Sequence, residues 1–296
     1  MSIVTQAEPV RVADTNAHEG PVYVSGEHAL CFTTLPKPGG GRHPVVDIKR
    51  LALGTGEVSV VRGDANVANG MTLAPDGRRL VVCEQHPAAI SLVDPATGRA
   101  EVLVDSWRGL PLNSPNEVVV KRDGTLWFTD PSYGYLQGFR PEPEVGDYVY
   151  RYDPDTGRLS VIADSFDKPN GIAFSPDEST LYVADSGANQ EPGSYYVDRP
   201  HHIVAFDVLD GRHLGPGRLF AVTTPGFPDG LKVDSAGRLY ASAFSGVQIF
   251  EPSGDLVEEI DLPGAVNFTF GGPDRDVLYV TTDEAVWAVQ LDARGA

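Results

Sequence analysis

The stretch that decides the fold is Asn170-Gly-Ile-Ala-Phe-Ser-Pro-Asp-Glu-Ser-Thr-Leu-Tyr-Val-Ala, residues 170–184. It contains a short apolar run that starts at Asn170, a polar turn, and a second run that starts at Leu181. Val, Ile, Tyr and Phe favour β-strands, whereas Gly, Pro, Asp and Asn favour turns. The stretch therefore predicts two short strands joined by a turn, with a polar residue at the start of the first.

The same unit recurs six times along the chain. In each copy a Glu, Asp or Asn stands 10 or 11 positions before a Leu that opens a β-type run. The pairs are Glu19 and Leu30, Asn69 and Leu80, Asn116 and Leu126, Asn170 and Leu181, Asp229 and Leu239, and Asn267 and Leu278. The six leucines are separated by 50, 46, 55, 58 and 39 residues. Repeats of this length built from short strands are typical of β-propellers.

We therefore predict an all-β fold, a six-bladed β-propeller with four-stranded blades. A large β-sandwich is the alternative, but it gives no reason for the constant spacing between the polar residue and Leu. The last unit has only three evident strands, at 267–271, 277–282 and 285–290. We expect residues 9–13 to supply its fourth strand and so to close the ring. On this interpretation residues 1–296 form a single domain.

Composition excludes several classes of function. The chain carries 41 Asp and Glu against 23 Lys and Arg, a net charge of −18. Such a surface repels phosphate backbones and anionic lipid, so we expect neither nucleic-acid nor membrane partners. We expect no signal peptide, because the first residues contain no apolar run, and we expect the two cysteines, Cys31 and Cys83, to be buried free thiols. These features predict a cytoplasmic protein, a monomer or weak homo-oligomer.

The six polar residues predict a metal site. The first strand of each propeller blade lines the central channel, so these side chains should converge near one mouth of it. Glu19 and Asp229 would repel each other there unless a cation neutralised them. An oxygen-only donor set favours Ca²⁺, followed by Mg²⁺ or Mn²⁺, with Zn²⁺ and Fe²⁺ as open alternatives. The competing interpretation is that Asn and Asp simply cap strand starts, and Asn69 and Asn267 are equally open to this role or to substrate contact.

Long loops after the second strands should form a rim around this mouth. They span residues 34–44, 130–147 and 186–201. Binding specificity commonly resides in such loops. The candidates for the pocket wall are His86, Tyr133, Tyr195, Tyr196, Arg199, His201 and His202. His18 precedes Glu19, and strand alternation should point it away from the channel.

Six motifs resemble the gluconolactonase family, which includes regucalcin, bacterial sugar lactonases and luciferin-regenerating enzyme. They are HEGP at 18–21, SPNEVVV at 114–120, LWFTDPSYG at 126–134, KPNGIAFSPD at 168–177, FPDGLKVD at 227–234 and NFTFGG at 267–272. The resemblance covers about residues 16–290. It implies a six-bladed propeller with one divalent metal, commonly calcium, in the channel. Ser114 departs from the Arg that animal sugar-lactone members carry there, and instead matches the Ser-Pro-Asn form that bacterial lactonase-like members often share.

The resemblance also implies roles for single residues. Glu19, Asn170 and Asp229 would bind the metal, and Asn116 would be a further ligand or a substrate contact. The more distant diisopropyl-fluorophosphatase uses a similar Glu, Asn, Asn, Asp set. The other expected substrate contacts are Asn69, Asn267, His86, Tyr133 and His201.

The leading hypothesis for the function is metal-assisted hydrolysis of a small lactone, with Asp229 as general base or, as an alternative, as nucleophile. Phosphotriester hydrolysis or a biosynthetic reaction at the same metal are rival enzymatic interpretations. From a different class comes a calcium-binding propeller that acts as a scaffold or regulator. The rim loops that select the substrate are the least patterned part of the chain, so the sequence does not name the lactone.

Overall fold

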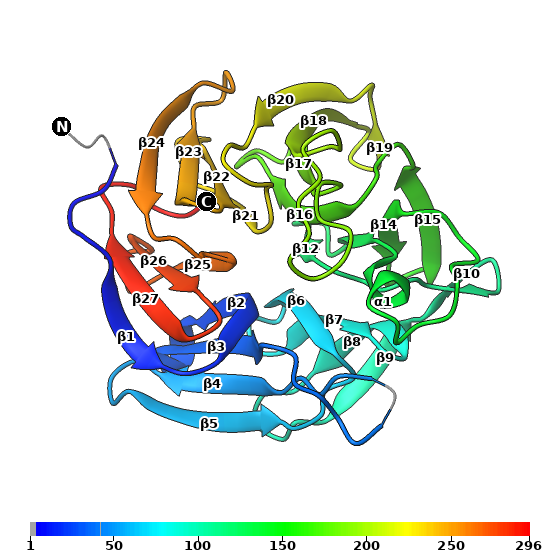
Figure 1. Ribbon diagram of the computed structural model, residues 1–296, viewed down its shortest axis with the longest axis horizontal. Helices are drawn as coiled ribbons and strands as arrows, with labels where there is room; N and C mark the ends of the chain where they lie inside the picture. Colours follow the sequence, from blue (N-terminus) through cyan, green and yellow to red (C-terminus); the bar gives the residue numbers. More distant parts are fainter. Residues whose placement is uncertain (1–3, 42) are drawn as a thin grey trace.

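The protein is a ring of six antiparallel sheets, seen face-on in the computed structural model (Figure 1). The structure describes residues 4–41 and 43–296. The predicted six-bladed β-propeller is confirmed, and so is the expectation of an all-β chain. Helix in the described residues is limited to α1 (Tyr133–Leu136) and the 3-10 turn η1 (Ser25–Glu27).

Each blade runs outward from the centre in chain order. Blade 1 contains β2 (Ala17–Val24), β3 (Ala29–Thr34), β4 (Ile48–Ala52) and β5 (Glu57–Arg62). Blade 2 contains β6 (Ala68–Leu73), β7 (Leu80–Gln85), β8 (Ala88–Val93) and β9 (Ala100–Val104). Blade 3 contains β12 (Val118–Val120), β13 (Leu126–Asp130), β14 (Tyr148–Asp153) and β15 (Arg158–Ala163). A small hairpin of β10 (Ser106–Trp107) and β11 (Leu110–Pro111) connects blades 2 and 3.

The second half of the ring repeats the pattern. Blade 4 contains β16 (Pro169–Phe174), β17 (Thr180–Asp185), β18 (His202–Leu209) and β20 (Arg218–Val222), with β19 (His213–Leu214) as a short addition. Blade 5 contains β21 (Leu231–Val233), β22 (Leu239–Ala243), β23 (Gly246–Phe250) and β24 (Leu256–Asp261). Blade 6 contains β25 (Asn267–Gly271), β26 (Val277–Thr281) and β27 (Ala285–Gln290).

The fourth strand of blade 6 comes from the N-terminus. β1 (Val10–Asp14) pairs antiparallel with β27, with Val10 opposite Ala288 and Asp14 opposite Ala285. The predicted closure is therefore confirmed, with the strand shifted by one residue from the expected 9–13. β1 thus covers the outer edge of β27, and blade 6 has four strands like the other blades.

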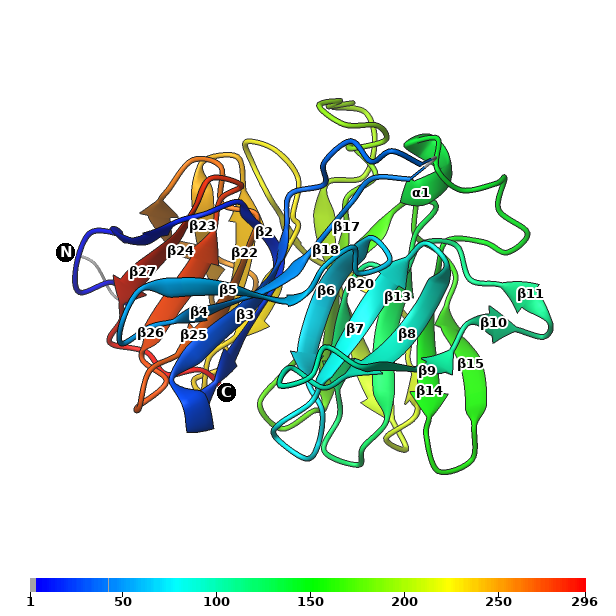
Figure 2. The same ribbon diagram turned by 90° about the horizontal axis from the view of Figure 1, so that it is seen from below.

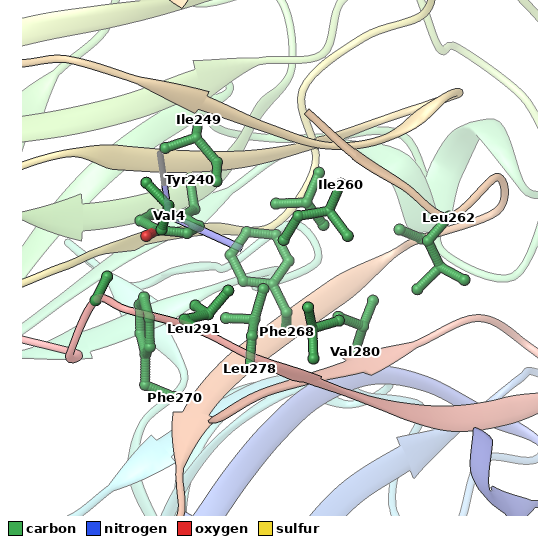
Figure 3. Packing of buried hydrophobic residues seen from close by; sticks show 14 residues of the cluster. Val4, Tyr240, Ile249, Ile260, Leu262, Phe268, Phe270, Leu278, Val280 and Leu291 are labelled. Carbon is green, nitrogen blue, oxygen red and sulfur yellow. The ribbon is translucent and has the colours of Figure 1, made fainter. Parts of the chain in front are cut away.

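The hydrophobic core lies between adjacent blades. Figure 3 shows one such layer, where Phe268 of β25 is surrounded by residues of blades 5 and 6 that include Tyr240, Ile249, Ile260 and Leu278. The second strand of each blade is buried on both faces, which explains why its sequence is a continuous apolar run. Cys31 and Cys83 lie in two of these strands as buried free thiols, as predicted. Among the described residues, no helix is long and apolar enough to cross a bilayer.

Candidate active site

The six polar residues of the repeat come together at one end of the channel. β2, β6, β12, β16, β21 and β25 are the innermost strands of the six blades. Each polar residue is among the first three residues of its strand or stands two residues before it. Five of them line one cavity: Glu19, Asn69, Asn116, Asn170 and Asp229. The sixth, Asn267, lies behind the wall and donates a hydrogen bond from Nδ2 to Glu19 Oε2 at 2.7 Å.

Glycines pack the strand starts tightly against one another. In four blades the residue after the channel residue is Gly, and a side chain there would collide with the next blade. A Cβ atom would lie 2.6 Å from Asn69 O at Gly20, 2.4 Å from Asn116 O at Gly70, 2.0 Å from Asp229 O at Gly171, and 2.5 Å from Asn267 Oδ1 at Gly230. Real Cβ atoms do not approach this closely, so only Gly lets the channel residues of neighbouring blades meet.

Two of the channel asparagines are held by the same device. The Asp130 carboxylate, at the end of β13, accepts hydrogen bonds from the backbone N–H of Asn113 and Ser114, just before Asn116. In blade 4, the Asp185 carboxylate at the end of β17 accepts them from Asp167 and Lys168, just before Asn170. Both loops are thereby fixed in the conformation that presents the Asn to the channel.

The cavity above these residues has a volume of about 360 Å³. This lies within the range of roughly 300–1,000 Å³ that is usual for small-molecule sites. All three predicted rim loops contribute to its wall, through Leu35 and Pro36, through Tyr133 and Gln137, and through residues 189–192. Figure 2 shows α1 and the loops between β3 and β4 and between β17 and β18 on the same face of the ring.

Burial and neighbouring carboxylates destabilise the charges of Glu19 and Asp229, the two acids among the channel residues. Burial and the charge of Asp229 raise the pKa of Glu19 to about 8. Burial and the charge of Glu117 raise the pKa of Asp229 to about 7, although a hydrogen bond from Asn170 opposes this. Without a cation, the site therefore resists full ionisation near neutral pH.

Sequence reasoning missed a third carboxylate, Glu117. Its side chain is 2% exposed and its Oε2 accepts a hydrogen bond from Asn267 Nδ2 at 2.8 Å, the same atom that bonds Glu19. Lys232 Nζ lies 3.8 Å from that oxygen. A signal was present in the sequence, because Glu117 is a carboxylate directly after a channel residue, at a position where four other blades have Gly.

The donor set fits a hard divalent cation. Glu19, Asn116, Asn170 and Asp229 line the cavity with carboxylate and amide oxygens, and no Lys or Arg lines it among the described residues. His18, whose charge lowers the pKa of Glu19, is itself hydrogen-bonded to Asp283. The Asn69 Oδ1 atom is buried and has no hydrogen-bond partner among the described residues. Those residues contain no cluster of three His, Cys, Asp or Glu arranged for a metal ion. A cation here would therefore depend on amide oxygens as well as on the two acids.

The expectation for His18 is wrong. His18 lines the cavity, and its Nδ1 lies 2.5 Å from Asp283 Oδ1. The strand register shifts between Ala17 and Glu19, which places two residues of β2 opposite one of β3. Such a bulge breaks the alternation on which the expectation rested, so His18 and Glu19 both reach the channel side.

The remaining predicted pocket residues differ in their placement. Tyr133 lines the cavity, and burial raises its pKa. His86 lies outside its wall and packs on His43, with ring centroids 4.7 Å apart and the rings tilted by 37°. His201 contacts Tyr195, which in turn packs on Phe244. The cavity wall, as far as the structure describes it, includes none of Tyr195, Tyr196, Arg199, His201 and His202.

Comparison with known proteins agrees with this geometry. Residues 17–284 match the family described as the SMP-30/Gluconolactonase/LRE-like region. The chain belongs to this family. A gluconolactonase from Zymomonas mobilis is 31% identical over 286 residues, an alignment that covers 86% of this chain and 73% of that protein.

Solved structures of family relatives share the ring. A gluconolactonase structure from Xanthomonas campestris is 35% identical, with a TM-score of 0.82 over 96% of this chain and 89% of that one. A calcium-binding regucalcin from Agrobacterium tumefaciens has a TM-score of 0.75 over 98% of this chain and 95% of that one. At 19% identity that likeness concerns the fold alone.

Proposed function

We propose that this protein hydrolyses small hydroxylated lactones, with Asp229 as general base. The observation that carries the proposal is the cavity in which two acids and two amides from four different blades face a space of ligand size. Membership of a family that contains gluconolactonases supports the reaction class. The ligand is expected to be a small molecule, because the site is a concave pocket of ligand size with both polar and apolar side chains in its wall.

Asp229 is the carboxylate best placed to act on water. Both acids line the cavity, but Glu19 is only 4% exposed and is hydrogen-bonded to Asn267, whereas Asp229 is half-buried. In the proposed reaction, Asp229 takes a proton from a water molecule whose oxygen attacks the lactone carbonyl carbon. The ring C–O bond then breaks, and the ring oxygen takes up a proton as the hydroxy acid forms.

Glu19, Asn116, Asn170 and Asp229 would hold a divalent cation, and we propose Ca²⁺ on the basis of their hard oxygen donors. When bound, the cation would polarise the lactone carbonyl and stabilise the negative charge that develops on its oxygen. Asn116 and Asn170 contribute donors without adding charge. The hydrogen bond from Asn170 to Asp229 fixes the orientation of that carboxylate.

The wall chemistry favours a polyhydroxylated substrate. Five amide side chains line the cavity in addition to the proposed ligands: Asn69, Gln85, Gln137, Asn189 and Gln190. An amide offers both donors and an acceptor, which suits the hydroxyl groups of a sugar lactone. The unpartnered Oδ1 of Asn69 is a ready acceptor for one such hydroxyl. Leu35, Pro36 and Val46 provide an apolar surface for the C–H face of the ring.

The decisive experiment measures proton release from a panel of aldonolactones and simple lactones, with and without a chelator. We expect hydrolysis that is lost on chelation and restored by one divalent ion. Asp229→Asn should lower kcat at least about 100-fold while the circular dichroism spectrum stays unchanged. Asp164→Asn is the matched control, because Asp164 is exposed and lies outside the cavity.

Full activity in Asp229→Asn would remove Asp229 from the mechanism. If the protein hydrolysed phosphotriesters but none of the lactones, it would instead be a metal-dependent phosphotriesterase. Inactivity toward both, with Ca²⁺ bound and the fold intact, would favour a calcium-binding scaffold.

A further inference from the structure

A second cavity lies at the opposite end of the channel. It has a volume of about 690 Å³ and is lined by later residues of the same inner strands, such as Tyr23 of β2, Thr72 of β6 and Thr269 of β25. Lys232 of β21, three residues beyond Asp229, also lines it. The two cavities therefore share strands but have no lining residue in common.

The charge of this second cavity is opposite to that of the protein. Lys232 and Arg275 line it, and no Asp or Glu does among the residues that the structure describes. The chain as a whole has 41 acidic and 23 basic residues. A concave, carboxylate-free surface with two permanent cations in an acidic protein is a local trap for anions, because low-dielectric walls concentrate the field of the cations.

Neither cation is fully neutralised. Lys232 is 24% exposed and has one carboxylate near it, the buried Glu117 at 3.8 Å, which is longer than a hydrogen bond. Arg275 is exposed, and none of the described carboxylates lies within ion-pair distance of its guanidinium. Its backbone is nevertheless fixed, since its N–H donates to Gly272 O and its C=O accepts from Gly295 N–H.

An adjoining hollow extends the basic surface. It has a volume of about 450 Å³, shares Lys232 and Arg275 with the first, and adds Arg122. Its one acidic side chain is Glu178, which is paired with Lys121 at 3.1 Å, and the chain end at Ala296 also borders it. Against the Glu178 carboxylate and the terminal carboxylate of Ala296 stand three cations on this wall, Arg122, Lys232 and Arg275.

We propose that this end of the channel binds a small polyvalent oxyanion, of the sulfate or phosphate-ester class, between Lys232 and Arg275. Arg presents parallel N–H groups that match two oxygens of such an anion, and Lys adds a compact charge. Thr72 and Thr269 supply neutral hydroxyl donors on the same wall. The proposal is independent of lactone hydrolysis, because it uses no residue of the first cavity.

The test is calorimetric titration of the intact protein with sulfate at constant ionic strength, set with chloride. Sulfate stays divalent at neutral pH, and titrations in chelator and in Ca²⁺ separate this site from the cation site. We expect saturable binding that Arg275→Gln and Lys232→Met each weaken about tenfold or more, the value of one charge-assisted contact. Arg158→Gln is the matched control, since it removes one exposed cation from the outer strand of blade 3.

Lys232→Met leaves Glu117 without its nearby cation and can destabilise the fold. Arg275 is exposed, so Arg275→Gln should fold normally, and its effect on binding tests the proposal independently. If a hexose phosphate binds the wild type more tightly than sulfate does, and Arg275→Gln abolishes that difference, the natural ligand is a phosphorylated molecule. Equal affinities for hexose phosphate and sulfate would support a site for the bare oxyanion. Absence of saturable binding, or undiminished binding in Arg275→Gln, would overturn the proposal.

Discussion

Gly171 and Asp229 are in contact across blades 4 and 5, so closely that a Cβ atom on Gly171 would lie 2.0 Å from the carbonyl oxygen of Asp229. The position of the proposed general base is thus set by the absence of a side chain on the neighbouring blade. This relationship connects a glycine of the repeat directly to the chemistry of the site.

Gly171→Ala should therefore displace Asp229. We expect the free energy of unfolding to fall by about 1–3 kcal/mol, as is usual for overpacking, and the lactonase activity to fall with it. Urea unfolding and proton-release assays on the same preparation measure both. Gly54→Ala is the control, because a Cβ there meets nothing within 4 Å, and it should change stability by no more than about 0.5 kcal/mol. Equal behaviour of the two variants would contradict the packing argument.

Asn69 should act on substrate hydroxyls. Its Oδ1 is buried without a partner, so Asn69→Leu removes an acceptor that nothing else in the described structure uses. We expect KM for a polyhydroxylated lactone to rise about tenfold, and KM for an unsubstituted lactone of the same ring size to stay the same. A uniform loss of activity on both lactones would instead indicate that Asn69 supports the cation.

Asn267 should stabilise the site from behind. Its single Nδ2 donates to both Glu19 and Glu117, so Asn267→Leu leaves two buried carboxylates short of a donor. We expect a loss of about 2 kcal/mol or more in the free energy of unfolding, measured in chelator. If Asn267 contacted substrate instead, the variant would change KM and leave the stability of the cation-free protein unaltered.

The stability of the cation-free protein should fall as pH rises. The pKa values of Glu19 and Asp229 are raised to about 8 and about 7 in the folded chain, above their ordinary values of 4.5 and 3.8. Between these limits the folded chain binds more protons than the unfolded chain, so the free energy of unfolding decreases with pH.

The measurement is the melting temperature in chelator from about pH 5 to about pH 8. Ca²⁺ should raise it most at the alkaline end, because the cation favours the ionised carboxylates. In chelator, Asp229→Asn should make the melting temperature depend less steeply on pH. A melting temperature that rises with pH in chelator would contradict the raised pKa values.

Lys168 should hold the rim loops in place. Its Nζ lies 2.7 Å from Asp147 and 3.1 Å from Asp167, and Asp167 is paired with Arg199 at 2.9 Å. Lys168→Met should destabilise the fold by about 3 kcal/mol and raise KM more than it lowers kcat, because the loops that carry Tyr133 and Gln190 lose their tether. Lys37→Met, on the exposed part of another rim loop, should leave KM and kcat unchanged.

The architecture was predictable because it is written in a repeated pattern. Strand starts, turns and apolar runs recur with constant spacing, and the strand β1 that closes the ring was expected within one residue. The convergence of the channel residues follows from that geometry, since the same place in each blade faces the axis. The family resemblance is confirmed by the match over residues 17–284.

The details that were missed depend on contacts between distant segments. His18 reaches the channel because of a bulge, which the period-two alternation of a strand does not reveal. Glu117 gains its importance from Asn267, 150 positions away in the chain. His86 and His201 lie in loops whose course depends on side-chain contacts. The composition of these loops did not show that His86 packs on His43 or that His201 contacts Tyr195.

The hydrogen bond between Asn267 and Glu19 joins positions 248 residues apart and can form only when blade 6 closes against blade 1. All the residues that line the cavity lie between His18 and Asp229, so blade 6 acts on the site only from behind, through Asn267. Ligand binding at this mouth should therefore depend on the docking of blade 6 against blade 1. A chain in which that blade has not docked should bind ligand weakly, although it carries every residue of the cavity wall.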